Sequence, residues 1–239
     1  MWQISLHETQ RADEARQARL VGPLTMRWAE ELTPDLRRRA VAEMTIEHVS
    51  SGAYVCRKGE PVDAWIGVMS GILKLSSVSP EGKAISFTGV PTGGWFGEGS
   101  LLKNEPRRYD AIALRDCIVA YVPRGTFIAL LEASVPFNRF VINQLNERLA
   151  QFIGMVERDR LLGPEARLAT ELAALFNPQL YPGNQATLPI SQTEIANLVG
   201  LSRQRVNRAL KRLAQMQLVS VDYRGLTVLD PEGLKRFQR

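Results

Sequence analysis

The sequence predicts an α+β protein, in which a β-rich region is followed by a long helix and a small helix-turn-helix domain. Short apolar runs separated by glycine occupy residues 46–123. This spacing is typical of an all-β sandwich or barrel. Residues 137–160 contain no proline and repeat their apolar side chains at helical spacing. Residues 190–213 form two short helical patterns separated by Gly200-Leu201-Ser202.

An N-terminal helical segment is expected over residues 1–45, before the β-rich region of residues 46–135. Its apolar residues recur at every fourth position, which is a helical spacing: Leu20, Leu24, Trp28, Leu32 and Leu36.

The composition favours a cytoplasmic protein with a polyanionic partner. The 30 Lys and Arg residues against 25 Asp and Glu residues give a formal net charge of +5. We expect no membrane span, because no run approaches the roughly 18 apolar residues that cross a bilayer. We also expect no secretory signal, because the first residues include acids and lack an apolar core.

The long helix, expected over residues 136–162, carries a candidate dimer interface. Its apolar residues step by 3, 4, 3 and 4 along the chain: Ile142, Leu145, Leu149, Phe152 and Val156. A sustained period of about 3.5 is that of a coiled-coil seam, which favours a partner helix. The alternative is a long amphipathic helix that lies on its own barrel. Leu162-Gly163-Pro164 should end the helix and form a hinge to a domain of residues 163–239.

The second helix of the 190–213 pattern combines a buried stripe with a basic outer face. Val206, Ala209, Leu210 and Leu213 follow the i, i+3, i+4, i+7 period, and Ser202 stands at the N-cap position. No acidic residue occurs among the outward positions. In the major groove Arg pairs with guanine, and Gln or Asn pairs with adenine. The pattern therefore favours a helix-turn-helix over a solvated helix in a helical hairpin.

Each candidate DNA contact follows from its place in this motif. Arg203, Gln204 and Arg208 are expected at base edges, because the start of a recognition helix enters the groove. Phosphate contacts are expected from Ser191, Thr193, Ser202 and Arg205. Two short β runs flank Tyr223-Arg224-Gly225, so Arg224 is a further candidate at the tip of a small wing.

A second motif lies in the β-rich region, where Gly97-Glu98-Gly99-Ser100 is followed by Arg107. The glycines allow several backbone N–H groups to converge on an anion. Glu98 can accept from a ribose hydroxyl, while an arginine pairs with phosphate oxygens. The residues fit a pocket for a phosphorylated sugar or, equally, an ion pair that only fixes a hairpin.

In its order of motifs the chain resembles the cyclic-AMP receptor protein/FNR family of bacterial transcription regulators, from about Gly52 to Leu229. The resemblance is carried by Gly52, Gly59, Gly71, the loop FGEGSLL with its following PR, the long helix and SQTEIANLVGLSRQRVNRALKRL. It implies a cyclic-nucleotide-binding-like β-roll, a dimerisation helix and a C-terminal winged helix-turn-helix. It also implies a homodimer that binds a palindromic promoter site.

The resemblance also assigns an effector site, with departures from the family pattern. Its phosphate-binding cassette corresponds to Gly97, Glu98, Gly99 and Ser100, with Arg107 as the phosphate-pairing residue. Arg108 stands where cyclic-AMP binders carry a small residue. Phe152 and Ile153 replace small hydroxyl residues that meet adenine, and neither can hydrogen-bond a base edge. Phe152 could instead stack on a base.

These departures argue against cyclic AMP in its usual mode, and leave another nucleotide, such as a cyclic dinucleotide, or ligand-free action. Gln204 replaces the acid common in cyclic-AMP-type members, so adenine is expected where an acid selects cytosine.

The sequence excludes several other classes of site. It lacks the cysteine cluster that an iron–sulfur sensor needs. Cys56 and Cys117 lie in apolar runs, which argues against haem ligation, and no metal-ligand spacing is present. We find no nucleophile–base pair in the sequence of the kind that would indicate an enzyme.

The expected partners are double-stranded DNA and a second copy of the chain, with RNA polymerase as a further candidate. A nucleotide-sensing module that acts through a protein partner is the alternative.

Overall fold

The computed structural model describes residues 26–82, 84–183, 186–223 and 225–237, with side chains 158–160 also left undescribed. The α+β prediction is confirmed. An N-terminal 3-10 helix and a short α-helix precede the first strand: η1 (Arg27–Glu31) and α2 (Pro34–Glu43). Thr33 caps α2 by accepting from the Leu36 amide. Residues 1–25 of the helical segment expected over residues 1–45 lie outside the described residues.

Two four-stranded antiparallel sheets form the β-roll. One has the order β1 (Thr45–Val49), β8 (Cys117–Pro123), β3 (Ala64–Ser70) and β6 (Trp95–Phe96). The other has the order β2 (Tyr54–Cys56), β7 (Asp110–Ala113), β4 (Ile72–Val78) and β5 (Ala84–Pro91). Apolar side chains of both sheets, including Ile66 and Leu75, share one buried cluster.

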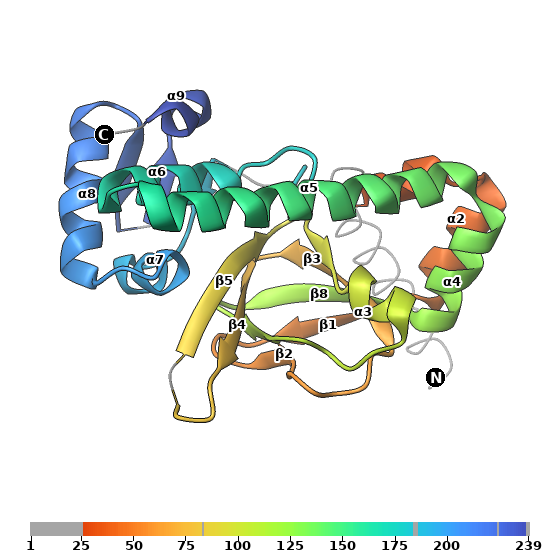
Figure 1. Cartoon of the computed structure of the whole chain (residues 1–239). Helices are drawn as coiled ribbons and strands as arrows, with labels where there is room; N and C mark the ends of the chain where they lie inside the picture. The colour runs from red at the N-terminus through yellow and green to blue at the C-terminus, as the bar shows by residue number, and fades with distance from the viewer. Residues whose placement is uncertain (1–25, 83, 184–185, 224, 238–239) are drawn as a thin grey trace, which may run out of the picture.

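Three helices connect or cover this roll: α3 (Glu98–Lys103), α4 (Arg124–Ala133) and α5 (Val135–Leu161). In Figure 1, α5 runs along the whole roll from α4 to the C-terminal domain. An aromatic cluster forms where η1, the roll, α4 and α5 meet. It consists of Trp28, Trp65, Trp95, Phe127 and Phe137, and the ring centroids of Trp65 and Trp95 lie 4.5 Å apart.

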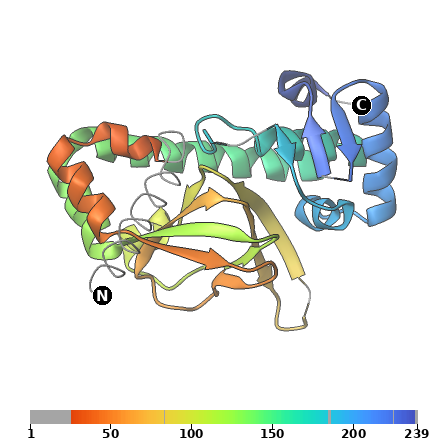
Figure 2. The ribbon, with the colours of Figure 1, turned by 180° about the vertical axis from the view of Figure 1, so that it is seen from behind.

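The C-terminal domain is a winged helix-turn-helix at the far end of α5 (Figure 2). Its elements are α6 (Pro164–Ala174), β9 (Thr187–Leu188), α7 (Gln192–Val199), α8 (Arg203–Gln215), β10 (Val219–Asp222), β11 (Gly225–Val228) and α9 (Pro231–Arg236). The strands form a sheet in the order β10-β11-β9. The two helices around Gly200 and the hairpin were predicted, whereas α3, β9 and α9 were not.

The C-terminal domain packs on the β-roll. Ile72 of β4 belongs to the domain's own apolar core. A Cβ added to Gly89 of β5 would lie 3.0 Å from Leu175, so glycine permits close contact there. Arg115 Nη1 also donates to the Pro189 carbonyl at 2.7 Å.

Among the described residues no single helix is long and apolar enough to cross a membrane. Helices α4 and α5 pass this test only when they are taken together, by length and composition, and they form a pair bent by 116°.

Candidate functional site: a buried cassette and an exposed recognition helix

The glycine-acid loop forms a tight junction between β6 and α3. Gly97 has a φ of +94°, in the left-handed region that favours glycine. A Cβ added there would collide with Arg107 Nη1, so a side chain at this position would have to displace that guanidinium. Glu98 begins α3 and is only 3% exposed. Gly99 and Ser100 follow in the same turn, partly exposed.

Arg107, the predicted phosphate-pairing residue, is buried against this loop. Its Nη2 donates to the Ala64 carbonyl at 2.6 Å and lies 3.8 Å from Asp63 Oδ1. Its Nη1 is buried and has no hydrogen-bond partner among the described residues. Arg107 also lines a cavity of about 590 Å³, together with Glu60 and Tyr121. Leaving such a donor unpaired costs about 1–3 kcal/mol or more, so an anion at Nη1 would be stabilised.

Arg148 of α5 joins the cassette and was missed by the sequence analysis. Its Nε donates to Glu98 Oε1 at 2.8 Å, and its Nη2 donates to the Trp95 carbonyl. Burial, the largest single effect, lowers the pKa of Arg148, but the charge and hydrogen bond of Glu98, together with the charges of Tyr181 and Tyr109, raise it above its ordinary value. Burial and the same carboxylate raise the pKa of Tyr109, which therefore stays neutral.

A signal for Arg148 exists in the sequence. Val141, Gln144, Arg148, Gln151 and Met155 step by 3, 4, 3 and 4, beside the apolar seam. This series is the face that α5 turns toward the roll: Gln144 Nε2 donates to the Gln179 carbonyl at 2.7 Å, and Gln151 Nε2 lies 3.5 Å from Thr88 Oγ1. A polar residue at core spacing on an amphipathic helix thus indicates a buried partner.

Two predicted effector residues do not join this buried set. The guanidinium of Arg108 is exposed and donates to the Glu105 carboxylate, so the side chain lies at the surface. Phe152 lies one turn after Arg148 and is 36% exposed, on the flank that carries Leu149. The geometry groups Glu98, Arg107 and Arg148 around Gly97.

One face of α5 lies on its own roll, as the alternative to a coiled coil predicted. Another face exposes an apolar stripe, which holds most of the residues predicted for a dimer interface. Ile142 is 54% exposed and Leu149 is 59% exposed, and Phe152, Ile153 and Val156 extend the stripe. Leu145 is the exception among the predicted seam residues, because it packs partly buried against the N-terminal apolar cluster.

The recognition helix α8 has the predicted division of faces. Val206, Ala209, Leu210 and Leu213 are all buried. The residues expected to reach DNA are all exposed: Arg203, Gln204, Arg205 and Arg208. Ser202 caps the helix by accepting from the Arg205 amide at 3.4 Å. Arg212 forms an ion pair of 2.5 Å with Glu165 of α6, which fixes α8 to its domain.

The preceding helix α7 is fixed by a capping box. Ser191 Oγ accepts from the Glu194 amide at 3.2 Å, and the Ser191 amide donates to Glu194. Thr193 is exposed in the first turn. Asn207 Nδ2 donates to Gln192 Oε1 at 3.0 Å and so joins α8 to α7. Arg224, the predicted wing contact, lies outside the described residues.

Cys56 and Cys117 are buried free thiols. Burial raises the pKa of both, which keeps them protonated. No group of three His, Cys, Asp or Glu side chains within the described part of the chain could hold a metal ion.

Two known families match separate parts of the chain. The cyclic nucleotide-binding domain family matches residues 46–134, and the Crp-like helix-turn-helix domain family matches residues 166–237. The chain belongs to the Crp/Fnr family of transcription regulators. It is therefore a DNA-binding transcriptional regulator with a cyclic-nucleotide-binding domain.

The similar proteins agree with this assignment. The regulator is 27% identical to the CRP-like cAMP-activated global transcriptional regulator of Mycobacterium tuberculosis, over 79% of this chain and 85% of that protein. The structure of a CRP/FNR-family regulator from Thermus thermophilus is 26% identical, with a TM-score of 0.56 over 80% of this chain and 96% of that chain. FixK2 from Bradyrhizobium japonicum shares the fold, with a TM-score of 0.68 at 18% identity over 82% of this chain and 98% of that chain.

Replacing Arg148 by Met should destabilise the β-roll by about 3–5 kcal/mol, because Glu98 would stay buried without its partner. The double variant Glu98→Gln/Arg148→Met should recover most of that loss, since no uncompensated charge remains. Urea denaturation of each variant measures the free energy of unfolding.

The matched control is Arg139→Met, which removes an exposed arginine from the same helix and should change stability by less than about 0.5 kcal/mol. Equal unfolding midpoints for Arg148→Met and Arg139→Met would contradict a stabilising role for the buried pair.

Proposed function

We propose that this regulator acts as a homodimer that reads a palindromic promoter site with two copies of α8. The observation that supports this most is the exposed face of α8, where four predicted contact residues stand opposite a fully buried stripe. A polyanion matches that face, because none of its residues is acidic. We also expect the regulator to work in the bacterial cytoplasm, where promoter DNA is found.

The contact residues divide into base readers and phosphate contacts. We propose that Arg203 and Arg208 read guanines and that Gln204 reads adenine. Arg205, Thr193, Ser191 and Ser202 would contact phosphates. Capping does not prevent this for the two serines, because each hydroxyl accepts from a backbone amide and keeps its own proton to donate.

The exposed stripe on α5 supports the dimer. Ile142, Leu149 and Val156 are seven residues apart and exposed, which suits a paired helix and is costly to leave in water. In a dimer that reads two half-sites one turn of DNA apart, the recognition helices would lie about 34 Å apart. Contact with RNA polymerase stays a prediction.

We propose that the cassette responds to an anionic effector other than cyclic AMP in its usual mode. The Mycobacterium tuberculosis relative is described by its name as activated by cyclic AMP. In this chain, Arg148 already takes Glu98 Oε1, and Phe152 and Ile153 offer no hydrogen bond to a base. Arg107 keeps a buried N–H for an anion, which argues for a phosphate-bearing effector over ligand-free action.

Arg203→Ala should lower discrimination at one base pair of a site selected from random duplex DNA, by about 1–3 kcal/mol. Arg205→Ala should weaken binding to every sequence alike and make the log–log salt slope shallower, since phosphate contacts release counterions. Fluorescence anisotropy across salt concentrations measures both effects.

Lys58→Ala is the matched control, because it removes one positive charge from the β-roll. A flat salt response, or no DNA binding by the unaltered protein, would contradict the proposed function and favour action through a protein partner.

Leu149→Glu should weaken the dimer by about 100-fold or more, because it removes apolar burial and places an unpaired charge in the interface. Asn143→Glu, which adds the same charge to an exposed position away from the stripe, should leave the dimer intact. Sedimentation equilibrium measures both dissociation constants. Unchanged association of Leu149→Glu would show that α5 is not the interface.

Cyclic AMP at millimolar concentration should leave the melting temperature unchanged, whereas a matching cyclic dinucleotide or other cyclic nucleotide should raise it. A ligand at one hundred times its Kd stabilises the folded state by about 2.7 kcal/mol. Thermal-shift measurements on the unaltered protein and on Arg107→Ala test this, since any cassette ligand should lose its effect in the variant. A clear shift with cyclic AMP that Arg107→Ala abolishes would contradict the proposal.

A further inference from the structure

The segment between α6 and β9 leaves the DNA-binding domain and inserts into the β-roll. Residues 177–183, which we call the strap, run back along α5 in the cyan part of Figure 1. Leu180 is 1% exposed and Tyr181 is 2% exposed. Both belong to the apolar core of the roll, in one cluster with Val90 and Phe96. A part of the DNA-binding half therefore completes the sensor core.

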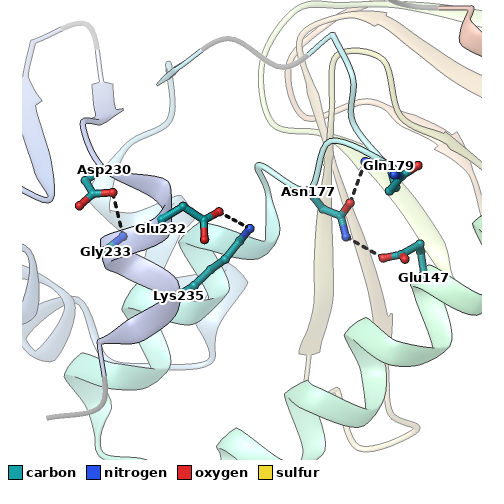
Figure 3. A network of polar contacts seen from close by, with 7 residues as sticks. All are labelled: Glu147, Asn177, Gln179, Asp230, Glu232, Gly233 and Lys235. Atoms are coloured by element: carbon teal, nitrogen blue, oxygen red, sulfur yellow. Dashed lines mark hydrogen bonds and ion pairs between the residues drawn. The ribbon is translucent and has the colours of Figure 1, made fainter.

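Polar contacts hold the strap against α5 (Figure 3). Asn177 Nδ2 donates to Glu147 Oε2 at 3.1 Å, which is the contact with α5 drawn in Figure 3. Gln144 Nε2 also donates to the Gln179 carbonyl at 2.7 Å. Asn177 Oδ1 accepts from the amides of Gln179 and Leu180, and the Tyr181 amide donates to the Asn177 carbonyl at 2.8 Å. The strap is thus a folded turn with a defined position.

The roll is shaped to receive the strap. A Cβ added to Gly93 would lie 2.5 Å from the Gly183 nitrogen, and one added to Gly94 would lie 2.9 Å from the Tyr181 ring. These two glycines come directly before Trp95, whose carbonyl accepts from Arg148. The close approach therefore occurs at the start of the effector cassette.

The Tyr181 side chain packs against the segment that leads into the cassette. Its hydroxyl is buried and has no hydrogen-bond partner among the described residues. Its ring lies against Gly94, next to Trp95, whose carbonyl accepts from Arg148, and Arg148 in turn pairs with Glu98. Glu98 Oε2 is also buried without a partner in the described part of the chain. A change at Glu98 can therefore affect the strap through Arg148, Trp95 and the neighbouring Gly94.

We propose that Tyr181 is a positioning residue that couples the cassette to the DNA-binding domain through the strap. When Arg148 is paired with Glu98 and the Trp95 carbonyl, the Tyr181 ring stays packed on Gly94 and the strap holds the domain in one orientation. When an effector or a substitution alters that pair, Arg148 and Tyr181 rearrange together and the domain is released. This inference rests on the proposed function, because it gives the cassette its route to α8.

A double-variant cycle tests the coupling without knowledge of the effector. The full-length protein, Glu98→Gln, Tyr181→Phe and Glu98→Gln/Tyr181→Phe are titrated with a DNA site selected by the unaltered protein. Glu98→Gln should change DNA affinity about fivefold or more, the scale of an allosteric coupling. In the Tyr181→Phe background the same substitution should change affinity by less than about twofold.

Tyr54→Phe is the matched control, because Tyr54 is a partly exposed tyrosine on β2 of the roll. It should leave the effect of Glu98→Gln intact. Tyr181→Phe keeps the ring in the core, so its melting temperature should match that of the unaltered protein. If Tyr181 had a purely structural role, Tyr181→Phe would change the stability of the protein, but the effects of Tyr181→Phe and Glu98→Gln on DNA affinity would simply add.

Hydrogen exchange gives a second readout that does not depend on DNA. Glu98→Gln should speed exchange of the Tyr181 amide, which is bonded to the Asn177 carbonyl. An additive cycle, no effect of Glu98→Gln on DNA affinity, or unchanged exchange would overturn the coupling. If the unaltered protein selects no DNA site, the proposed function fails first.

Discussion

The buried ion pair between Glu98 and Arg148 is the contact on which the arrangement of the sensor depends. Taking both charges out of water costs several kcal/mol per ion, which only a close pair with further hydrogen bonds offsets. Arg148 meets that need by bonding the Trp95 carbonyl as well as Glu98. Because one partner lies in the roll and the other on α5, the pair fixes the long helix to the cassette. Any ligand of Glu98 must therefore accommodate or replace Arg148.

Helix α5 can serve the sensor and an interface at once because its two faces follow two separate series of residues. Gln144, Arg148 and Gln151 face the roll and make specific hydrogen bonds. Ile142 and Leu149 face outward and carry apolar area that a second helix would cover. An event at the cassette and the proposed dimer interface thus share one rigid element, so a small shift of α5 would be felt at both.

The DNA-binding domain is attached to the sensor at more than the hinge. Ile72 enters the domain's core, Gly89 permits contact with Leu175, and the strap inserts Tyr181 in the opposite direction. This exchange of apolar side chains makes the orientation of α8 depend on the packing of the roll. Relative motion then requires several buried contacts to separate together, which favours two discrete arrangements over a continuous swing.

The sequence by itself determined the order of the three main parts, which are the β-rich region, the long helix and the helix-turn-helix, and it determined the faces of α8, because helical period, N-caps and glycine positions are local properties. Ser202, Val206 and Leu213 needed no knowledge of distant residues. It also identified Glu98 and Arg107 as a pair of interest. Only the tertiary structure decided that Glu98 bonds Arg148, fifty residues away. The same holds for Arg108, which lies at the surface, and for Tyr181, which enters the roll. The spacing of Arg148 indicates that it has a buried partner, but the identity of that partner depends on which segments meet in space, and that is not a local property of the sequence.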